Sequence, residues 1–265
     1  MIDGYFLDST AAIKFSFGCV ADRTVVGSKL SKTRVIISAY VLFEIARGYT
    51  RNLILLHNKC AQLGNFSELM KYARVVRLKS HFQGTILGAM ERYFEGEGAA
   101  LGLSDKERLI HFRAFARRLI RRGWKTLRRI ADLQVNRVGC REGFEDPTVN
   151  LDGLFVQELA LELCGIHSKC GLKAYAVAHR ADLERLRQKL KRIPDPDEET
   201  NKRIRSLRDL YGLPIKNFPA GVCYSCGDAV IAHECPSDST ILTNNRKHFD
   251  PISSVFGKAV EYFEV

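Results

Sequence analysis

The stretch CGDAVIAHECPSDSTILTNN, residues 226–245, places an acid at the start of one apolar run and two asparagines at the end of another. Asp228 follows Gly227, which permits a tight turn, so residues 229–232 predict the first turns of a buried helix with Asp228 in its N-cap region. Residues 240–243 combine β-branched and apolar side chains and predict a short buried strand. An acid that opens a helix is by itself an ordinary N-cap. The positions of other acids therefore decide whether Asp228 has a further role.

Short strands alternate with helices in the two terminal parts of the chain. Residues 5–7 predict a strand that ends at Asp8, residues 34–37 a second strand, and residues 259–265 a final one. A helix is expected over AYVLFEIARGYTRNLILL, residues 39–56. This order predicts an α/β fold with a largely parallel sheet covered by helices. Ligands of such sheets bind at the carboxyl ends of the strands.

Three acids are expected at that edge of the sheet: Asp8 after the first strand, Glu44 on the helix after the second, and Asp228 at the start of a late helix. Carboxylates that lie close together raise one another's pKa values, and a divalent cation relieves this repulsion. A set of hard oxygen ligands without cysteine or histidine favours Mg²⁺ or Mn²⁺. Replacing Asp228 by Asn is then expected to leave the thermal midpoint of the metal-free protein unchanged or to raise it.

The segments that carry these acids resemble, in order, the motifs of PIN-domain nucleases: YFLDST (residues 5–10), SAYVLFEIARGY (residues 38–49) and GDAVIAHECPSDSTILTNNRKHF (residues 227–249). This family includes ribonuclease toxins of toxin-antitoxin pairs and RNA-processing factors. The resemblance covers roughly residues 3–60 and 221–264. It implies a PIN-like fold in a single domain, with a core over residues 1–66 and 221–265.

The resemblance also assigns roles to individual residues. It implies that Asp8, Glu44 and Asp228 are catalytic metal ligands, with Ser9 as a supporting hydroxyl residue after the first acid. The fourth catalytic position of the family falls on Asn245, with Thr243 before it. Many members have an aspartate at this position, so the neutral amide of Asn245 puts binding of the metal by four carboxylates in doubt.

These residues predict a nuclease that hydrolyses phosphodiester bonds with Mg²⁺ or Mn²⁺, because the ion can activate water and stabilise charge on the phosphate. An endoribonuclease of toxin, defence or RNA-processing type is the favoured interpretation. Two alternatives stay open: a single-stranded DNA nuclease with the same mechanism, and a catalytically degenerate module that binds nucleic acid or a protein partner. An inhibitory or regulatory protein partner and a homo-oligomer also stay open.

The middle of the chain, about residues 67–220, is predicted to be a long and mainly helical insertion. Residues 104–107, SDKE, have the spacing of a capping box, and the helix they open is expected to run to about Leu133. Further helices are expected around residues 154–164, 172–191 and 198–211. This middle stretch does not resemble either of the α/β segments that flank it.

Basic residues are concentrated in this insertion, which holds 30 Lys and Arg against 20 Asp and Glu, whereas the rest of the chain holds 11 against 10. Four of them recur every fourth residue on the long helix: Arg113, Arg117, Arg121 and Lys125. Residues 106–129 contain ten Lys and Arg and a single acid, so few partners within the helix neutralise these charges. The pattern predicts a face that binds the phosphates of a nucleic acid.

The composition of the 265 residues, 46% of them hydrophobic, indicates a protein with a substantial core. Because no apolar run approaches the ~20 residues of a membrane span, we expect a soluble, cytoplasmic protein without membrane association. Eight scattered cysteines indicate a reducing compartment. One zinc site stays open as an alternative: Cys223, Cys226, His233 and Cys235. Three further histidines lack a ligand pattern and are interpreted as structural: His167, His179 and His248.

Overall fold

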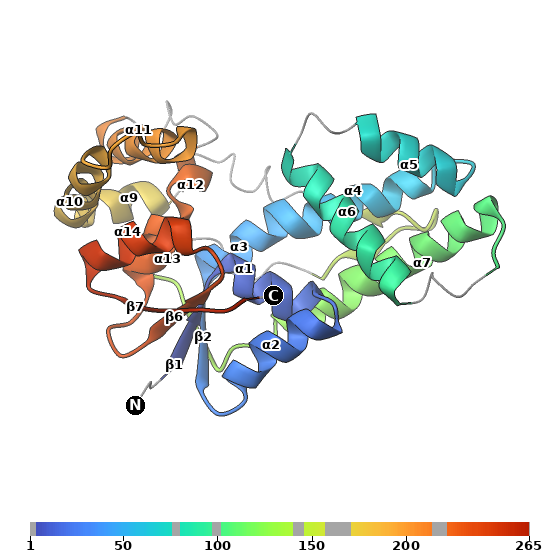
Figure 1. Cartoon of the computed structure of the whole chain (residues 1–265), viewed down its shortest axis with the longest axis horizontal. Coiled ribbons are helices and arrows are strands. Elements are labelled where there is room, and N and C mark those ends of the chain that lie inside the picture. Colours follow the sequence, from blue (N-terminus) through green and yellow to red (C-terminus); the bar gives the residue numbers. More distant parts are fainter. Residues whose placement is uncertain are drawn as a thin grey trace.

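Five parallel strands form the central sheet of the computed structural model, in the order β3-β2-β1-β6-β7 (Figure 1). The structure describes residues 4–75, 80–96, 102–139, 146–156, 171–213 and 222–264. The strands of the sheet are β1 (Gly4–Leu7), β2 (Arg34–Ser38), β3 (Leu133–Val135), β6 (Thr240–Thr243) and β7 (Ala259–Tyr262). All the pairs are parallel, so the predicted α/β fold with a parallel sheet covered by helices is confirmed.

The register of the three central strands brings their carboxyl ends together. Leu7 of β1 pairs with Ile37 of β2 on one side and with Leu242 of β6 on the other. Every residue of β1 and β6 is buried, as continuous apolar strands require when helices cover both faces of a sheet. The residues that follow these strands therefore lie next to one another at one edge.

Two short antiparallel strands, β4 (Thr148–Val149) and β5 (Phe155–Val156), form a separate hairpin. The helices in chain order are α1 (Ser9–Phe17), α2 (Val20–Leu30), α3 (Ala39–Ile45), η1 (Ala46–Thr50), α4 (Arg51–Cys60), α5 (Phe66–Val75), α6 (Ser80–Glu95), α7 (Asp105–Leu127), α9 (Gly171–Ala178), α10 (Arg180–Lys191), α11 (Glu198–Gly212), α12 (Val222–Ser225), α13 (Gly227–Glu234) and α14 (Arg246–Phe256). Figure 1 shows α4, α5, α6 and α7 grouped on one side of α3, and α9, α10, α11 and α12 grouped on the other.

The long basic helix α7 ends six residues before its predicted end. It stops at Leu127, and Leu133 belongs to β3, so the prediction that the helix runs to Leu133 is wrong. Asp132 fixes the start of β3 against β2. Its backbone N–H donates to the Val35 carbonyl and its carboxylate accepts from the Val35 N–H, both at 2.8 Å. The stretch predicted as an insertion thus supplies an edge strand of the central sheet.

Other predicted boundaries also change. Phe155 and Val156 form strand β5 where a helix was expected, and the rest of that predicted helix, residues 157–164, lies outside the described residues. The helix predicted over residues 172–191 is divided at His179 into α9 and α10, whereas α11 agrees with its prediction. The final strand ends at Tyr262.

The helix that carries Glu44 is interrupted by a wider turn. Residues 39–60 run as α3, the π-helical segment η1 and α4 without a break between them. Short π-helical turns inside α-helices are frequent at functional sites, because they change the direction in which side chains project. Here the π-turn begins two residues after Glu44. Within the described residues, no helix is long and apolar enough to cross a membrane.

Candidate functional site at the carboxyl edge of the sheet

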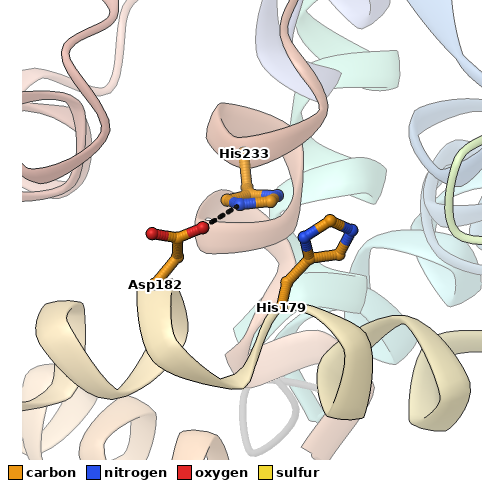
Figure 2. A group of neighbouring side chains, drawn as sticks. All are labelled: His179, Asp182 and His233. Carbon is orange, nitrogen blue, oxygen red and sulfur yellow. Dashed lines mark hydrogen bonds and ion pairs between the residues drawn. The ribbon is translucent and has the colours of Figure 1, made fainter.

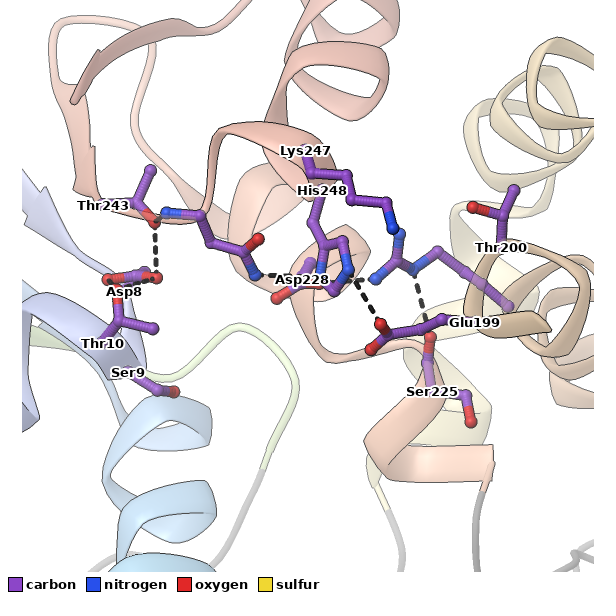
Figure 3. Close-up of polar contacts among 12 residues, drawn as sticks. Asp8, Ser9, Thr10, Glu199, Thr200, Ser225, Asp228, Thr243, Lys247 and His248 are labelled. Carbon is purple, nitrogen blue, oxygen red and sulfur yellow. Dashed lines mark hydrogen bonds and ion pairs between the residues drawn. The ribbon is translucent and has the colours of Figure 1, made fainter. Parts of the chain in front are cut away.

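Asp8 is the first of the acids at the carboxyl edge and is only 2% exposed. It caps α1 by accepting from the Ala11 N–H at 2.8 Å, and it accepts from the hydroxyl groups of Thr10 at 2.9 Å and Thr243 at 2.7 Å (Figure 3). Burial raises the pKa of Asp8 to about 6 despite these hydrogen bonds, and the charge of Asp228 adds to the rise. Asp8 is thus both the N-cap of α1 and an acid at the end of β1 whose charged form is destabilised by burial.

Glu44 lies between the segments that carry the other two acids. Its Oε2 accepts a hydrogen bond from the Ser9 hydroxyl, next to Asp8. Its Oε1 lies 3.0 Å from the position that a Cβ on Gly227, next to Asp228, would occupy. Burial raises the pKa of Glu44 to about 7, and the charges of Asp228 and Asp8 contribute to the rise. Glu44 is therefore part of the edge cluster and is not a solvated acid on the helix surface.

Asp228 stands in the first turn of α13 but does not cap it. The N-cap of α13 is Cys226, which makes no side-chain capping bond. The Oδ2 atom of Asp228 instead accepts from Nη2 of Arg203 at 2.6 Å and lies 2.9 Å from Nδ1 of His248 (Figure 3). Arg203 comes from α11 and is only 4% exposed. The N-cap interpretation of Asp228 is therefore replaced by an ion pair with a buried guanidinium group.

This ion pair changes the expectation for Asp228→Asn. Removing the carboxylate relieves its repulsion with Asp8 and Glu44, but it also leaves Arg203 buried without its acidic partner. Breaking a buried pair by removing one partner costs about 3 to 5 kcal/mol. With this pair present, we expect the thermal midpoint of Asp228→Asn to fall and not to stay unchanged or rise.

A hydrogen-bonded chain extends from Asp228 to the end of β6. The side-chain amide nitrogen of Asn245 lies 2.8 Å from Nδ1 of His248, and the Asn245 N–H donates to the Thr243 hydroxyl at 3.0 Å. Nε2 of His248 lies 3.0 Å from Glu199 of α11. The hydrogen bond to Asp228 raises the pKa of His248. Asn245 therefore joins the cluster through His248 and Thr243.

The geometry can be compared with the needs of a divalent cation. The charge of Asp228 contributes to the raised pKa values of Asp8 and Glu44. Within the described part of the chain, however, the carboxylate oxygens of the three acids do not form a group in which all ligand atoms lie within 4.8 Å of one another. Mg²⁺ usually keeps several waters and binds through one or two carboxylates. The donor set, oxygen atoms with raised pKa values, fits such an ion, and Asp8 and Glu44 would hold it with Asp228.

A second buried cation adjoins Glu44. Arg47 is 4% exposed, and its guanidinium carbon lies 3.4 Å from the ring centre of Tyr224 and 4.8 Å from that of Phe43. Its Nε and Nη2 atoms are buried and make no hydrogen bond within the described structure. Unpaired buried donors are costly, so they favour an anionic ligand at this position.

The four predicted phosphate-binding residues differ in their surroundings. Arg121 and Lys125 are exposed on α7. Arg113 is partly buried and donates to the Gly153 carbonyl at 2.8 Å, and Arg117 is partly buried with no described partner for Nε. Both arginines lie near His57 of α4. Burial lowers the pKa of His57, and the charges of Arg113 and Arg117 lower it further. The exposed half of the basic face is thus the end nearer to β3.

The alternative zinc site does not assemble. Among the residues that the structure describes, Cys223, Cys226, His233 and Cys235 form no group with ligand atoms within 4.8 Å of one another. Cys235 Sγ instead lies 3.4 Å from the Pro236 carbonyl oxygen. His233 contacts Asp182 of α10. His167 lies outside the described residues.

Sequence reasoning missed Arg203, Arg47 and the role of His248. Arg203 is 25 residues from Asp228 on a different helix, and nothing local to it distinguishes it from the other arginines of the chain. His248 follows Asn245 by three residues, one helical turn, and this spacing was the signal available for it.

The fold and the edge cluster define an α/β protein with a parallel sheet and an acidic site at the carboxyl ends of its strands. Comparisons with models of protein families, with curated proteins and with solved structures find no match for the chain.

Proposed function

We propose that the protein is a metal-dependent nuclease of PIN type that hydrolyses phosphodiester bonds, with single-stranded RNA as the favoured substrate. One observation carries the proposal: Ser9 and Gly227 each bring Glu44 beside the segment of another acid, at the carboxyl edge of a parallel sheet. This is the edge at which open α/β sheets bind ligands. The pKa values of Asp8 and Glu44 are raised by burial and, in part, by the charge of Asp228, and such a group of acids favours a divalent cation over three separate structural roles.

Asp8, Glu44 and Asp228 would hold Mg²⁺ or Mn²⁺, which supplies activation of water and stabilisation of the negative charge on the phosphate. The protein residues position this site. Thr243 and Thr10 fix the Asp8 carboxylate, and Ser9 fixes Glu44. Asn245 and Asp228 both contact Nδ1 of His248.

Arg47 and Tyr224 support binding of the substrate next to the acids. The unpaired donors of Arg47 suit a phosphate oxygen, and guanidinium groups bind phosphates through two parallel hydrogen bonds. Tyr224 is 43% exposed and stacks on Arg47, so its outer face is open to a nucleic-acid base. Aromatic stacking is the usual means of holding unpaired bases. Arg121 and Lys125 would contact phosphates further along the strand.

A second candidate function is binding of nucleic acid without cleavage. Arg203 already places positive charge at Asp228, where a metal would otherwise be needed to offset its repulsion with the other acids. Asn245 in place of a fourth acid favours the same alternative. In this case the protein itself would compensate the acids, and added Mg²⁺ would produce no cleavage and no change in stability.

The deciding experiment measures cleavage of end-labelled single-stranded RNA and single-stranded DNA of the same sequence. The wild type should cleave RNA with Mg²⁺ or Mn²⁺ and should stop with EDTA. Asp8→Asn and Glu44→Gln should be inactive, whereas Glu91→Gln, at an exposed acid of α6, should match the wild type. Preferred cleavage of DNA would change the substrate class. Binding with no metal-dependent cleavage of either substrate would establish the second candidate.

A further inference from the structure

A second group of possible metal ligands lies at the other end of α13 from Asp228. His179 stands between α9 and α10, Asp182 is in the first turn of α10, and His233 is in the last turn of α13 (Figure 2). Within the described residues, this is the one group of three or more His, Cys, Asp or Glu residues with ligand atoms all within 4.8 Å of one another. Figure 2 shows the two imidazole rings and the carboxylate turned toward a shared space.

The distances suit a tetrahedral ion. Nε2 of His233 lies 3.3 Å from Oδ2 of Asp182. Bonds of about 2.0 to 2.1 Å to a tetrahedral Zn²⁺ place any two ligand atoms roughly 3.3 to 3.4 Å apart. The ring centres of His179 and His233 are 4.6 Å apart. Two of the three ligand atoms thus already have the spacing of a zinc site, and rotation of the His179 ring would supply the third.

Neighbouring side chains fix the orientation of the ligands. The hydroxyl group of Tyr175 contacts Nδ1 of His233, which leaves Nε2 directed at Asp182. Metal-binding histidines commonly have their second ring nitrogen held in this way by another polar group. The Tyr175 ring also packs on His179, with ring centres 4.6 Å apart. Asp182 is 40% exposed in its side chain and also pairs with Arg185, so the site is open to solvent on that side.

We propose that His179, Asp182 and His233 bind a first-row transition-metal dication, Zn²⁺ in particular, which joins α9 and α10 to α13. Two imidazoles and one carboxylate are the donors of zinc sites with an open fourth position, whereas Mg²⁺ prefers oxygen ligands alone. The ion would fasten two helices of the predicted insertion to the helix that carries Asp228. This inference is independent of the proposed nuclease activity, because it uses none of the sheet-edge acids.

The test uses the full chain after removal of metals with EDTA. Zn²⁺ is titrated in competition with a chromophoric chelator, and Co²⁺ is then used as a spectroscopic probe. The wild type should bind one Zn²⁺ at this site, and Co²⁺ should give visible bands of four-coordinate geometry without a sulfur-to-cobalt charge-transfer band. Asp182→Asn should weaken Zn²⁺ binding at least tenfold, and His179→Gln should do the same.

Two controls separate this site from others. His111→Gln removes a partly buried histidine of α7 and should leave the affinity unchanged. The double variant Cys223→Ser, Cys226→Ser should also bind as the wild type does. Circular dichroism checks that each variant is folded. If a histidine variant unfolds, Asp182→Asn decides the test, because the Asp182 side chain is partly exposed and its replacement should leave the fold intact.

The proposal is overturned if the wild type shows no competition with the chelator. It is also overturned if Asp182→Asn and His179→Gln bind Zn²⁺ as the wild type does, or if the cysteine variant alone loses the ion. A Zn²⁺ signal that disappears with Asp8→Asn and survives in Asp182→Asn would place the ion at the sheet edge and would equally refute the site described here.

Discussion

Replacing Glu44 by Gln should stabilise the metal-free protein at neutral and alkaline pH while abolishing cleavage. The carboxylate is held by Ser9 and lies beside the elements of two other acids. Glutamine has nearly the same shape and still accepts from Ser9, but it carries no charge. The substitution therefore removes repulsion and desolvation of the charge and leaves the packing in place.

The size of the effect follows from the pKa of Glu44, which burial and the neighbouring acids raise from 4.5 to about 7. A group with a raised carboxyl pKa binds a proton more readily in the folded state, so its ionised form destabilises the fold. The penalty is absent below about pH 4.5, grows as the pH rises toward 7, and is constant above it. At 1.36 kcal/mol per pKa unit it amounts to about 3 kcal/mol.

Part of this gain is offset in the variant. Glutamine loses the attraction between Glu44 and Arg47 and the stronger hydrogen bond of an ionised acceptor. A net stabilisation of about 2 kcal/mol at pH 8 is expected. For a chain of this length it should raise the thermal midpoint by about 4 °C. At pH 4.5 the two proteins should unfold at nearly the same temperature.

The assay is thermal unfolding by circular dichroism in EDTA, at pH 4.5 and at pH 8, with Glu91→Gln as the matched exposed substitution. Mg²⁺ should then stabilise the wild type at pH 8 and have no effect on the variant. A Glu44→Gln protein that is less stable than the wild type at pH 8, or equally shifted at both pH values, would refute the reasoning. Glu44 would then be an ordinary structural acid.

Three further predictions concern the same edge and the basic helix. Asp228→Asn should lower the free energy of unfolding by about 3 kcal/mol in denaturant titrations, because it leaves Arg203 buried and unpaired, and the double variant with Arg203→Met should recover most of that loss. Mg²⁺ affinity measured by calorimetry should rise at least tenfold between pH 6 and pH 8, because the Asp8 and Glu44 carboxylates, with pKa values of about 6 and about 7, lose their protons there; a flat profile would exclude them as ligands. Replacing exposed Arg121 and Lys125 by Ala in the inactive Glu44→Gln protein should reduce the salt dependence of RNA binding by about 1.4 units of log–log slope, and an unchanged slope would assign this face to another role.

The sequence by itself determined the central strands and the acids that follow them. Residues 5–7 and 240–243 are short apolar runs that end at polar residues, and burial on both faces of a sheet produces this pattern locally. Because parallel strands end at one edge, the order of the elements also placed Asp8, Glu44 and Asp228 near one another. The basic face of α7 and its capping box could be read in the same way.

Only the tertiary structure decided what surrounds those acids. Arg203 reaches Asp228 from a different helix, and the pairing depends on how α11 packs, which no local pattern encodes. Leu133 continues the apolar spacing of α7, yet residues 133–135 form β3 by pairing with the distant strand β2, a contact that no local pattern encodes. His179 and His233 are 54 residues apart and meet because α10 and α13 both pack against α14. Local propensity fixes elements and their ends, whereas pairing between distant side chains follows from long-range packing.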